Sequence, residues 1–169
     1  MPHRLRQTPE PPNPLRLEHQ LCFATHAAAL ALQKVYRPLL RPLGLTYPQY
    51  LALLVLWEEP EVTLGELGRR LLLDSGTLTP LVKRLEQAGW VMRRRDEADE
   101  RRLLVSLTPA GRRLRDKARD IPACMLQTCG LQAQEAQRLK QRMDSLRQQL
   151  LLSLTESTNP APRSRKGTP

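Results

Sequence analysis

The stretch from residue 63 to residue 108 constrains the fold most, because two helical patterns are followed there by two strand patterns. Thr63 and Glu66 have the spacing of a capping box, in which a hydroxyl and a carboxylate close the start of a helix. The tripeptide Asp74-Ser75-Gly76 then interrupts this helix and supplies a cap for the next one. The second helix repeats apolar residues at helical spacing, which predicts one buried stripe. The residues of this stripe are Leu78, Leu81, Val82 and Leu85.

The other side of the second helix carries short hydroxyls and cations, which are able to contact phosphate groups and base edges of DNA. A buried stripe behind such side chains is what a DNA-recognition helix requires. Gly89 tolerates a positive φ and is predicted to end this helix. We therefore predict DNA contacts from this helix and its entry. The candidate residues are Ser75, Thr77, Thr79, Lys83 and Arg84.

Two strand patterns follow, and an acidic link, residues 96–100, joins them. Apolar residues recur at every second position of the stretch 103–107, as in a strand with one packed face. Runs of arginine flank the link, and Arg94 and Arg95 are further candidates for DNA contact. We predict a β-hairpin with a charged tip, called a wing. The pattern leaves one alternative open, which is an ordinary helical domain with a solvated charged hairpin.

Composition limits the class of protein. The chain has 169 residues, of which 40% are hydrophobic and only 4% aromatic, so we expect one domain with a core of leucine and alanine, which favours helices. A net charge of +10 favours nucleic acid or an anionic membrane surface as partner. Composition alone is equally compatible with a soluble protein that has a basic surface and no such partner. No apolar run approaches the roughly 20 residues of a membrane span, and no signal peptide is expected. Three cysteines argue against a disulfide framework, and we expect a cytoplasmic protein.

Two helices are predicted before the central stretch. The first runs from about Arg16 to Leu40, with Cys22 near its start, and Pro38 and Pro42 break it or bend its end. Thr46 is predicted to cap the second, which ends at about Glu58. The predicted buried face of the second helix comprises Leu51, Leu54 and Val55.

The C-terminal part is predicted to be helical as well. A helix begins at Thr108 and Pro109, Pro122 interrupts it, and a final helix runs from about Gln132 to Leu154. The final helix has an apolar stripe, which either covers the core or forms a dimer interface with the first helix. This stripe consists of Leu139, Met143, Leu146, Leu150 and Leu154.

The chain is thus predicted to consist of one domain between two disordered ends. Five prolines lie in the N-terminal segment, and the C-terminal segment is similar in kind. The predicted boundaries are residues 1–14 for the arm, 15–155 for the domain and 156–169 for the tail, with dimerisation helices in 15–45 and 112–155 and the DNA-binding unit in 63–108.

The order of these elements resembles the multiple antibiotic resistance regulator (MarR) family of dimeric winged-helix repressors. The exit Leu107-Thr108-Pro109-Ala110-Gly111 and the segment Asp99-Glu100-Arg101 carry part of this resemblance. In the wing of that family an Asp steadies an Arg that reaches the minor groove, which implies these roles for Asp99 and Arg101. The resemblance implies a mainly α fold with a small β-hairpin wing and N- and C-terminal dimerisation helices. It also implies a homodimer that binds double-stranded DNA at an inverted-repeat operator.

Three stretches resemble one branch of this family, the organic hydroperoxide resistance regulators (OhrR). They are Gln20-Leu21-Cys22-Phe23-Ala24, Leu45-Thr46-Tyr47-Pro48-Gln49-Tyr50 and Leu72-Leu73-Asp74-Ser75-Gly76-Thr77-Leu78-Thr79-Pro80-Leu81, and the similarity covers about residues 17–150. In that branch an organic hydroperoxide is the inducer. It oxidises a Cys at the start of the first helix, which two tyrosines hydrogen-bond, and the oxidised repressor leaves DNA. The matching residues here are Cys22, Tyr36 and Tyr47.

Cys124 and Cys129 follow Pro122 in a stretch that resembles the place of the resolving Cys in two-cysteine members of the branch. The matching position is Gln127, with a Cys on each side. The resemblance therefore leaves open which Cys resolves the oxidised sensor. Cys129 is slightly favoured, because the Gly130 that follows it is able to relax the backbone.

The implied sensor has simple chemical requirements. A thiol reacts with peroxide as the thiolate, which a helix N-terminus and two tyrosine O–H donors would favour. The apolar neighbours Leu21 and Phe23 are expected to favour organic peroxides over hydrogen peroxide. His19 and His26 lie on the same helical face as Cys22, where they either assist the thiolate, bind a metal with a further ligand, or stay exposed and idle. No metal site and no cofactor are predicted.

Other functions stay open at this point. The main alternative is a repressor of the same fold that a small phenolic or lipophilic ligand releases from DNA. A thiol peroxidase and a non-specific nucleoid protein are the remaining alternatives, the second favoured by charge alone. The most specific residues belong to a DNA-reading unit, so we predict a regulator and not an enzyme.

Overall fold

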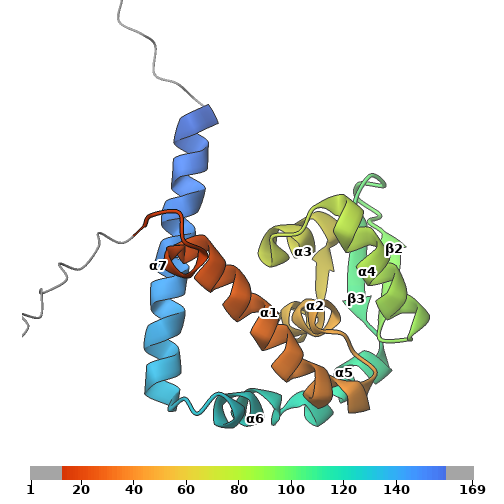
Figure 1. Cartoon of the computed structure of the whole chain (residues 1–169). Coiled ribbons are helices and arrows are strands. Elements are labelled where there is room, and N and C mark those ends of the chain that lie inside the picture. Colours follow the sequence, from red (N-terminus) through yellow and green to blue (C-terminus); the bar gives the residue numbers. More distant parts are fainter. Residues whose placement is uncertain (1–12, 159–169) are drawn as a thin grey trace, which may run out of the picture. The chain divides into compact units, whose positions relative to one another are not determined.

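The structure is a computed structural model that describes residues 13–158, with side chains as far as residue 154 (Figure 1). The chain divides after Ile121 into two compact units. The first unit contains the 3₁₀ helix η1 (Leu17–His19), α1 (Leu21–Leu40), the 3₁₀ helix η2 (Arg41–Leu43), α2 (Tyr47–Glu58), β1 (Glu61–Thr63), α3 (Leu64–Leu71), α4 (Ser75–Gln87), β2 (Val91–Arg95), β3 (Leu103–Leu107) and α5 (Pro109–Ala118). Helix α6 (Ile121–Thr128) begins at the boundary, and α7 (Ala133–Thr158) follows it.

The chain ends differ from the sequence prediction in detail. The first α-helix begins at Leu21 and not near Arg16, because Gln20 has extended backbone angles and separates η1 from α1. Cys22 therefore lies in the first turn of α1. Helix α7 continues beyond the predicted end at Leu154 to Thr158. The rest of the predicted arm and tail, residues 1–12 and 159–169, lies outside the described residues.

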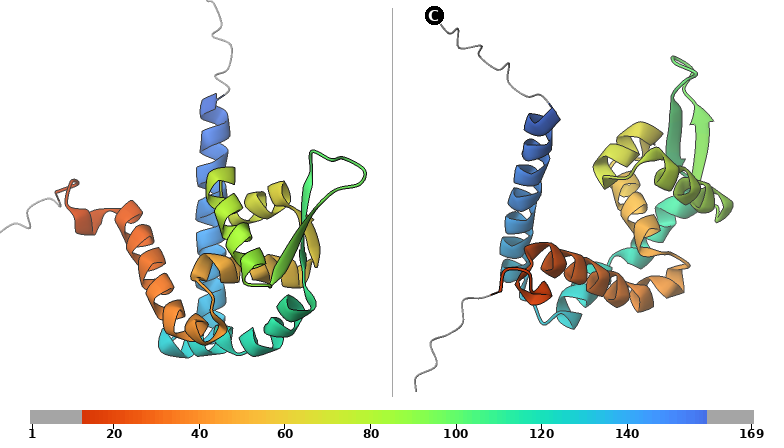
Figure 2. Two further views of the ribbon diagram at one scale, coloured as in Figure 1. Left: turned by 90° about the vertical axis from the view of Figure 1, so that its right-hand side faces the viewer. Right: turned by 45° about the horizontal axis from the view of Figure 1, so that its top comes forward.

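The predicted hairpin is part of a three-stranded antiparallel sheet in the order β1-β3-β2. Strand β1 was not predicted, because three residues are too few for a period of two to be recognised. Val105 of β3 pairs with Val62 of β1 on one side and with Arg93 of β2 on the other. Val62 and Val105 are both buried, so the sheet fastens the base of the hairpin to the helical core. Figure 2 shows the rest of the β2–β3 hairpin projecting from the helices of this unit.

The core of the first unit confirms one predicted stripe and corrects another. All four stripe residues of α4, Leu78, Leu81, Val82 and Leu85, are buried. In α2 the predicted Leu51 and Leu54 are only half-buried, whereas Val55 and its neighbours are buried. Helix α2 contacts α1, α3, α4 and α5, so it is covered on several sides and no single stripe describes it. The buried residues of α2 are Tyr50, Ala52, Leu53, Val55 and Leu56.

Side chains cap the starts of α2 and α3. Thr46 forms a capping box with Gln49, whose side-chain oxygen accepts the Thr46 N–H at 2.8 Å. Thr63 accepts the Glu66 N–H at 3.1 Å. The Glu66 carboxylate pairs with Arg69 at 2.6 Å instead of returning to Thr63, so only half of the predicted capping box forms there.

Asp74 caps the recognition-helix candidate α4. Its carboxylate accepts the Thr77 N–H and the Thr77 hydroxyl, each at 2.9 Å. These hydrogen bonds hold the pKa of Asp74 below its usual range, because they favour the charged carboxylate. The start of α4 is thus defined by a local contact that the sequence already predicted.

Gly111 lies where α5 packs against the end of the α4–β2 loop. Its carbonyl accepts the Trp57 indole N–H at 3.0 Å, and the Thr108 N–H donates to the Trp90 carbonyl at 3.1 Å. A Cβ atom at position 111 would lie 2.0 Å from the Trp90 carbonyl oxygen. This close approach of two backbone segments requires glycine.

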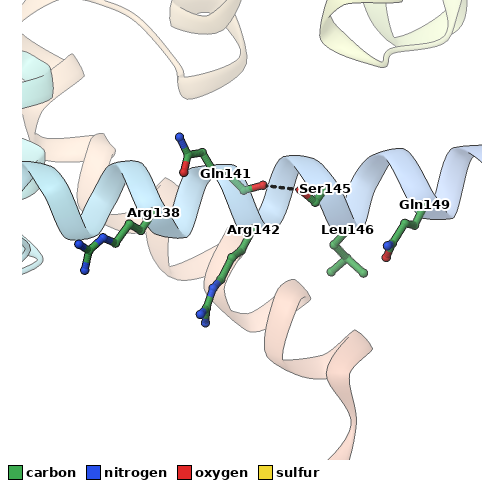
Figure 3. A pocket seen from close by; sticks show the side chains of 6 residues that line it. All are labelled: Arg138, Gln141, Arg142, Ser145, Leu146 and Gln149. Carbon is green, nitrogen blue, oxygen red and sulfur yellow. Dashed lines mark hydrogen bonds between the residues drawn. The ribbon is translucent and has the colours of Figure 1, made fainter.

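The second unit is dominated by the long helix α7. Figure 3 shows Arg138, Arg142 and Leu146 on one side of this helix, and the Ser145 hydroxyl donates to the Gln141 carbonyl at 3.0 Å. The shallow groove drawn there has all its lining residues on α7, so it is a helix face and not an enclosed ligand site. The predicted apolar stripe of α7 is exposed at Leu139, Met143, Leu150 and Leu154. Across the described part of the chain, no helix has the length and apolar character that crossing a membrane requires.

Candidate DNA-binding surface and redox site

Helix α4 presents its predicted polar side to the surface. The candidates Ser75, Thr77, Thr79, Lys83 and Arg84 are all exposed, opposite the buried stripe. The Thr77 hydroxyl is already engaged, because it donates to Asp74. The geometry therefore leaves two hydroxyls and two cations of α4 available to a partner.

Ion pairs fasten the wing, and sequence reasoning did not anticipate them. The Arg93 guanidinium of β2 donates to the Glu86 carboxylate of α4 at 2.5 Å, which lowers the pKa of Glu86. Arg94 pairs with Glu61 of β1 at 2.9 Å. The wing is thereby tied both to the recognition helix and to the first strand. Glu61 lies before the helix-turn-helix and Glu86 near the end of its second helix, and the distance of each from its arginine along the chain gives no local signal of such pairs.

The two hairpin arginines proposed for DNA contact therefore have partners within the protein. Arg94 is paired with Glu61, and the Arg95 guanidinium donates to the Glu100 carbonyl at 2.8 Å. At the tip, the Asp99 carboxylate accepts from Arg101 at 3.2 Å, and the Arg101 side chain is 92% exposed. This is the contact that the resemblance implied between the two residues. Of the hairpin candidates, Arg101 is the one that the geometry leaves most accessible.

Cys22 is exposed at the second residue of α1, with the extended Gln20 as the N-cap. Leu21 and Phe23 beside it are exposed as well. His19, proposed as a neighbour, has its Nδ1 atom 3.1 Å from the Asn13 carbonyl. Among the described residues, no group of side chains suited to a metal ion is found.

The two predicted tyrosines lie together, but far from Cys22 of the same chain. The Tyr36 and Tyr47 ring centroids are 4.8 Å apart, and Tyr50 continues the cluster at 5.7 Å from Tyr36. Cys22 and Tyr36 are both in α1, and at a rise of 1.5 Å per residue they are separated by about 21 Å. One chain therefore does not bring the three predicted residues into contact.

Burial raises the pKa of Tyr47 and that of Tyr50, because the charged phenolate is poorly solvated in this cluster. The negative charge of an ionised Tyr47 would raise the pKa of Tyr50 further. Both phenols consequently keep their protons at neutral pH. Tyr47, which is half-buried, is thus suited to donate a hydrogen bond.

Cys124 and Cys129 lie at α6 in the second unit. Cys124 is half-buried, whereas Cys129 is exposed just after the end of the helix. The Cys129 sulfur is 3.2 Å from the Met125 sulfur, and Gly130 has a positive φ of 65°. Which of the two thiols resolves the oxidised sensor stays a prediction.

A helix-turn-helix with an exposed polar recognition face, joined to a hairpin that ion pairs hold in place, defines the winged-helix class of DNA-binding proteins. The sequence comparisons specify the family. Residues 45–103 match the MarR family. The chain belongs to this family of winged-helix transcriptional regulators.

Its relatives include redox regulators. The chain is 50% identical over 132 residues to the organic hydroperoxide resistance transcriptional regulator of Bacillus subtilis strain 168, covering 78% of this chain and 88% of the relative. Reduced AbfR of Staphylococcus epidermidis bound to DNA has a TM-score of 0.71 and 38% identity, over 83% of this chain and 96% of AbfR. Disulfide-formed AbfR has a TM-score of 0.57 and 40% identity, over 78% of this chain and 93% of AbfR. These relatives are regulators of transcription and not enzymes.

The exposed arginine at the wing tip leads to a first prediction. Arg101→Ala is expected to weaken DNA binding about tenfold or more, because the wing tip loses an exposed cation that is able to contact a phosphate group or a base edge. Its thermal unfolding should stay close to that of the parent protein, since the side chain is almost fully exposed. Gel-shift titrations at several salt concentrations measure the change, and the salt dependence should become shallower.

Arg119→Ala is the matched control, because it removes the same charge from an exposed position at the end of α5. An equal loss of affinity in both variants would mean that net charge, and not the wing tip, is responsible.

Proposed function

We propose that this protein is a transcriptional repressor that senses organic hydroperoxides by oxidation of Cys22 and then releases its operator. One observation carries the proposal. Cys22 is exposed in the first turn of α1, in a chain that is 50% identical to an organic hydroperoxide resistance regulator. We further propose that the protein acts in the cytoplasm, as a bacterial transcriptional regulator of this family would.

The proposed active form is a homodimer. Helix α1 buries only Leu40 within the described chain, and α7 leaves a long apolar stripe exposed. Such surfaces need a partner, and a second copy of the chain supplies one of the same kind. A two-fold dimer would present two α4 helices to DNA, which fits an inverted-repeat operator with half-sites about one helical turn apart.

The dimer also accounts for the distance between the sensor residues. Cys22 and Tyr36 are 14 positions apart on α1, which is close to four turns, so they lie on nearly the same side of the helix. If two α1 helices cross in antiparallel fashion near Ala29, Cys22 of one subunit faces Tyr36 and Tyr47 of the other. Three consecutive alanines, residues 27–29, are small enough to allow a close crossing there. We therefore propose a sensor site composed of two subunits.

The chemistry proposed for this site is a two-electron oxidation of sulfur. The Cys22 thiolate attacks the terminal oxygen of the hydroperoxide, the S–O bond forms and the O–O bond breaks. The alkoxide leaves and takes up a proton as the alcohol, and the sulfur becomes a sulfenic acid. Tyr47 remains protonated and suits two tasks, because its phenol donates either to the thiolate or to the departing alkoxide.

A mixed-dimer experiment tests the composite site. One chain carries Cys22→Ser, the other carries Tyr36→Phe with Tyr47→Phe, and different tags allow the heterodimer to be purified. In the Phe-containing homodimer, Cys22 should react with cumene hydroperoxide about tenfold more slowly or worse, because the thiolate loses its two donors. In the heterodimer, the single Cys22 faces two intact tyrosines and should react at the parental rate.

The heterodimer of parental and Cys22→Ser chains is the control, since its single Cys22 also faces intact tyrosines. Slow oxidation in the first heterodimer together with fast oxidation in the control would place the tyrosines in the same chain as Cys22 and overturn the composite site. The reaction is followed by trapping the sulfenic acid with dimedone.

A further inference from the structure

A pocket of about 460 Å³ opens beside the tyrosine cluster of the first unit. It lies between the end of α1, the turn after η2 and the start of α2. Leu45, Tyr47 and Pro48 provide its apolar wall, and Gln33, Arg37 and Arg41 provide its polar wall. This volume is that of a site for an organic molecule of moderate size. Tyr47, a residue of the proposed sensor, is therefore also a wall of this pocket.

The two arginines make the pocket strongly cationic. Arg37 is in the last turn of α1, and the Arg41 N–H donates to the Arg37 carbonyl, so the two side chains are one helical turn apart. Like charges at this spacing repel each other. Among the described residues no carboxylate pairs with either guanidinium, whereas Arg69, Arg70, Arg93 and Arg94 each have one. An anion bound between Arg37 and Arg41 would remove this repulsion.

The apolar wall restricts the kind of anion. Inorganic phosphate has no apolar part, so it would leave the apolar wall of Leu45, Tyr47 and Pro48 uncovered. A carboxylate attached to a hydrocarbon chain matches both walls, because guanidinium groups bind carboxylates through paired N–H donors and the chain covers the apolar side. A hydroperoxide group farther along the same chain would then lie beside Tyr47, where the proposed dimer places the Cys22 sulfur of the partner subunit.

We propose that Arg37 and Arg41 bind the carboxylate of an acidic organic hydroperoxide in this pocket, and that these two residues thereby make the sensor prefer acidic organic hydroperoxides over neutral ones. This inference rests on the proposed function, because the peroxide must reach Cys22 of the partner subunit beside Tyr47. The arginines act on recognition, and the oxidation itself is the reaction described above.

The test compares two peroxides that differ only in the carboxyl group, linoleic acid hydroperoxide and its methyl ester, below the concentration at which either forms micelles. Sulfenic acid formation at Cys22 should be about tenfold faster or more with the acid, since two charge-assisted hydrogen bonds hold it. In the variant Arg37→Gln with Arg41→Gln, the two rates should become similar. Its rate with cumene hydroperoxide should be unchanged. Arg69→Gln with Arg102→Gln removes two exposed charges of the same unit outside the helices proposed for the dimer and should keep the preference.

A second measurement needs no oxidation. Linoleate should bind to the Cys22→Ser protein in calorimetry, and adding Arg37→Gln and Arg41→Gln should abolish this binding. Equal rates with acid and ester in the parent protein, or a uniform slowing of all peroxides in the arginine variant, would overturn the carboxylate site. If Cys22 reacts with no peroxide while linoleate still binds through the arginines, the proposed function fails and the pocket assignment stands.

Discussion

Replacing Cys22 with serine is expected to leave operator binding intact and to abolish its release by organic hydroperoxide. The side chain is exposed, and among the described residues no hydrogen bond to its sulfur is made within one chain, so the exchange of sulfur for oxygen should cost little stability. A serine hydroxyl cannot be oxidised to a sulfenic acid, which removes the first step of the response. The effect should be all-or-none in a footprinting assay on the promoter beside the gene, with and without cumene hydroperoxide.

Cys124→Ser and Cys129→Ser are the natural comparison variants, because they remove a thiol from α6 and keep the sensor. We expect both to respond to peroxide at the first step, while a Cys22–Cys129 or Cys22–Cys124 bridge between chains forms only when the matching thiol is present. Non-reducing gels and peptide mass spectrometry after one equivalent of peroxide identify the bridge. A Cys22→Ser protein that still leaves DNA on peroxide treatment would remove Cys22 from the mechanism. If a phenolic ligand releases both the parent protein and the Cys22→Ser variant from DNA, the alternative function is favoured.

The second large effect is expected on stability, from Gly111→Ala. The new Cβ atom would lie 2.0 Å from the Trp90 carbonyl oxygen. The oxygen belongs to the backbone and the Cβ atom is bonded to the backbone, so no side-chain rotation can relieve the clash. The start of α5 must then shift and strain the bonds from Trp57 to Gly111 and from Thr108 to Trp90. Overpacking and the loss of a buried hydrogen bond together predict a decrease of about 3 kcal/mol or more in the free energy of unfolding.

Gly65→Ala is the matched control, because Gly65 is an exposed residue in the first turn of α3 and a Cβ atom there meets nothing within 4 Å. This variant should be as stable as the parent or more stable by up to about 1 kcal/mol, since alanine favours the helix. Urea unfolding at one fixed protein concentration compares the three proteins. A Gly111→Ala protein that unfolds with the parent would contradict the close contact between α5 and Trp90.

The elements that the sequence predicted well depend on residues close together in the chain. The caps at Thr46, Asp74 and Thr108 each act within three residues, and the buried stripe of α4 repeats within two turns. Such signals survive in any fold, because a helix brings positions three and four apart onto one face whatever packs against it. The resemblance of three stretches to a known branch added Cys22 and the tyrosines.

Other features depend on residues that only folding brings together. Strand β1 forms because β3, more than forty positions later, offers it a partner, and the half-burial of Leu51 and Leu54 reflects the helices that surround α2. The pairing of Arg94 with Glu61 likewise joins residues 33 positions apart. Local periodicity contains no information on such contacts.

By itself, then, the sequence determined where the DNA-reading helix and the wing begin and end, and which side chains they expose. The tertiary structure decided which arginines of the wing are tied to the protein and that Arg37 and Arg41 line one pocket with Tyr47. The physical reason is the range of the interactions. Caps and helical stripes are set by neighbours in the chain, whereas pockets and ion pairs between distant residues are set by distances in space.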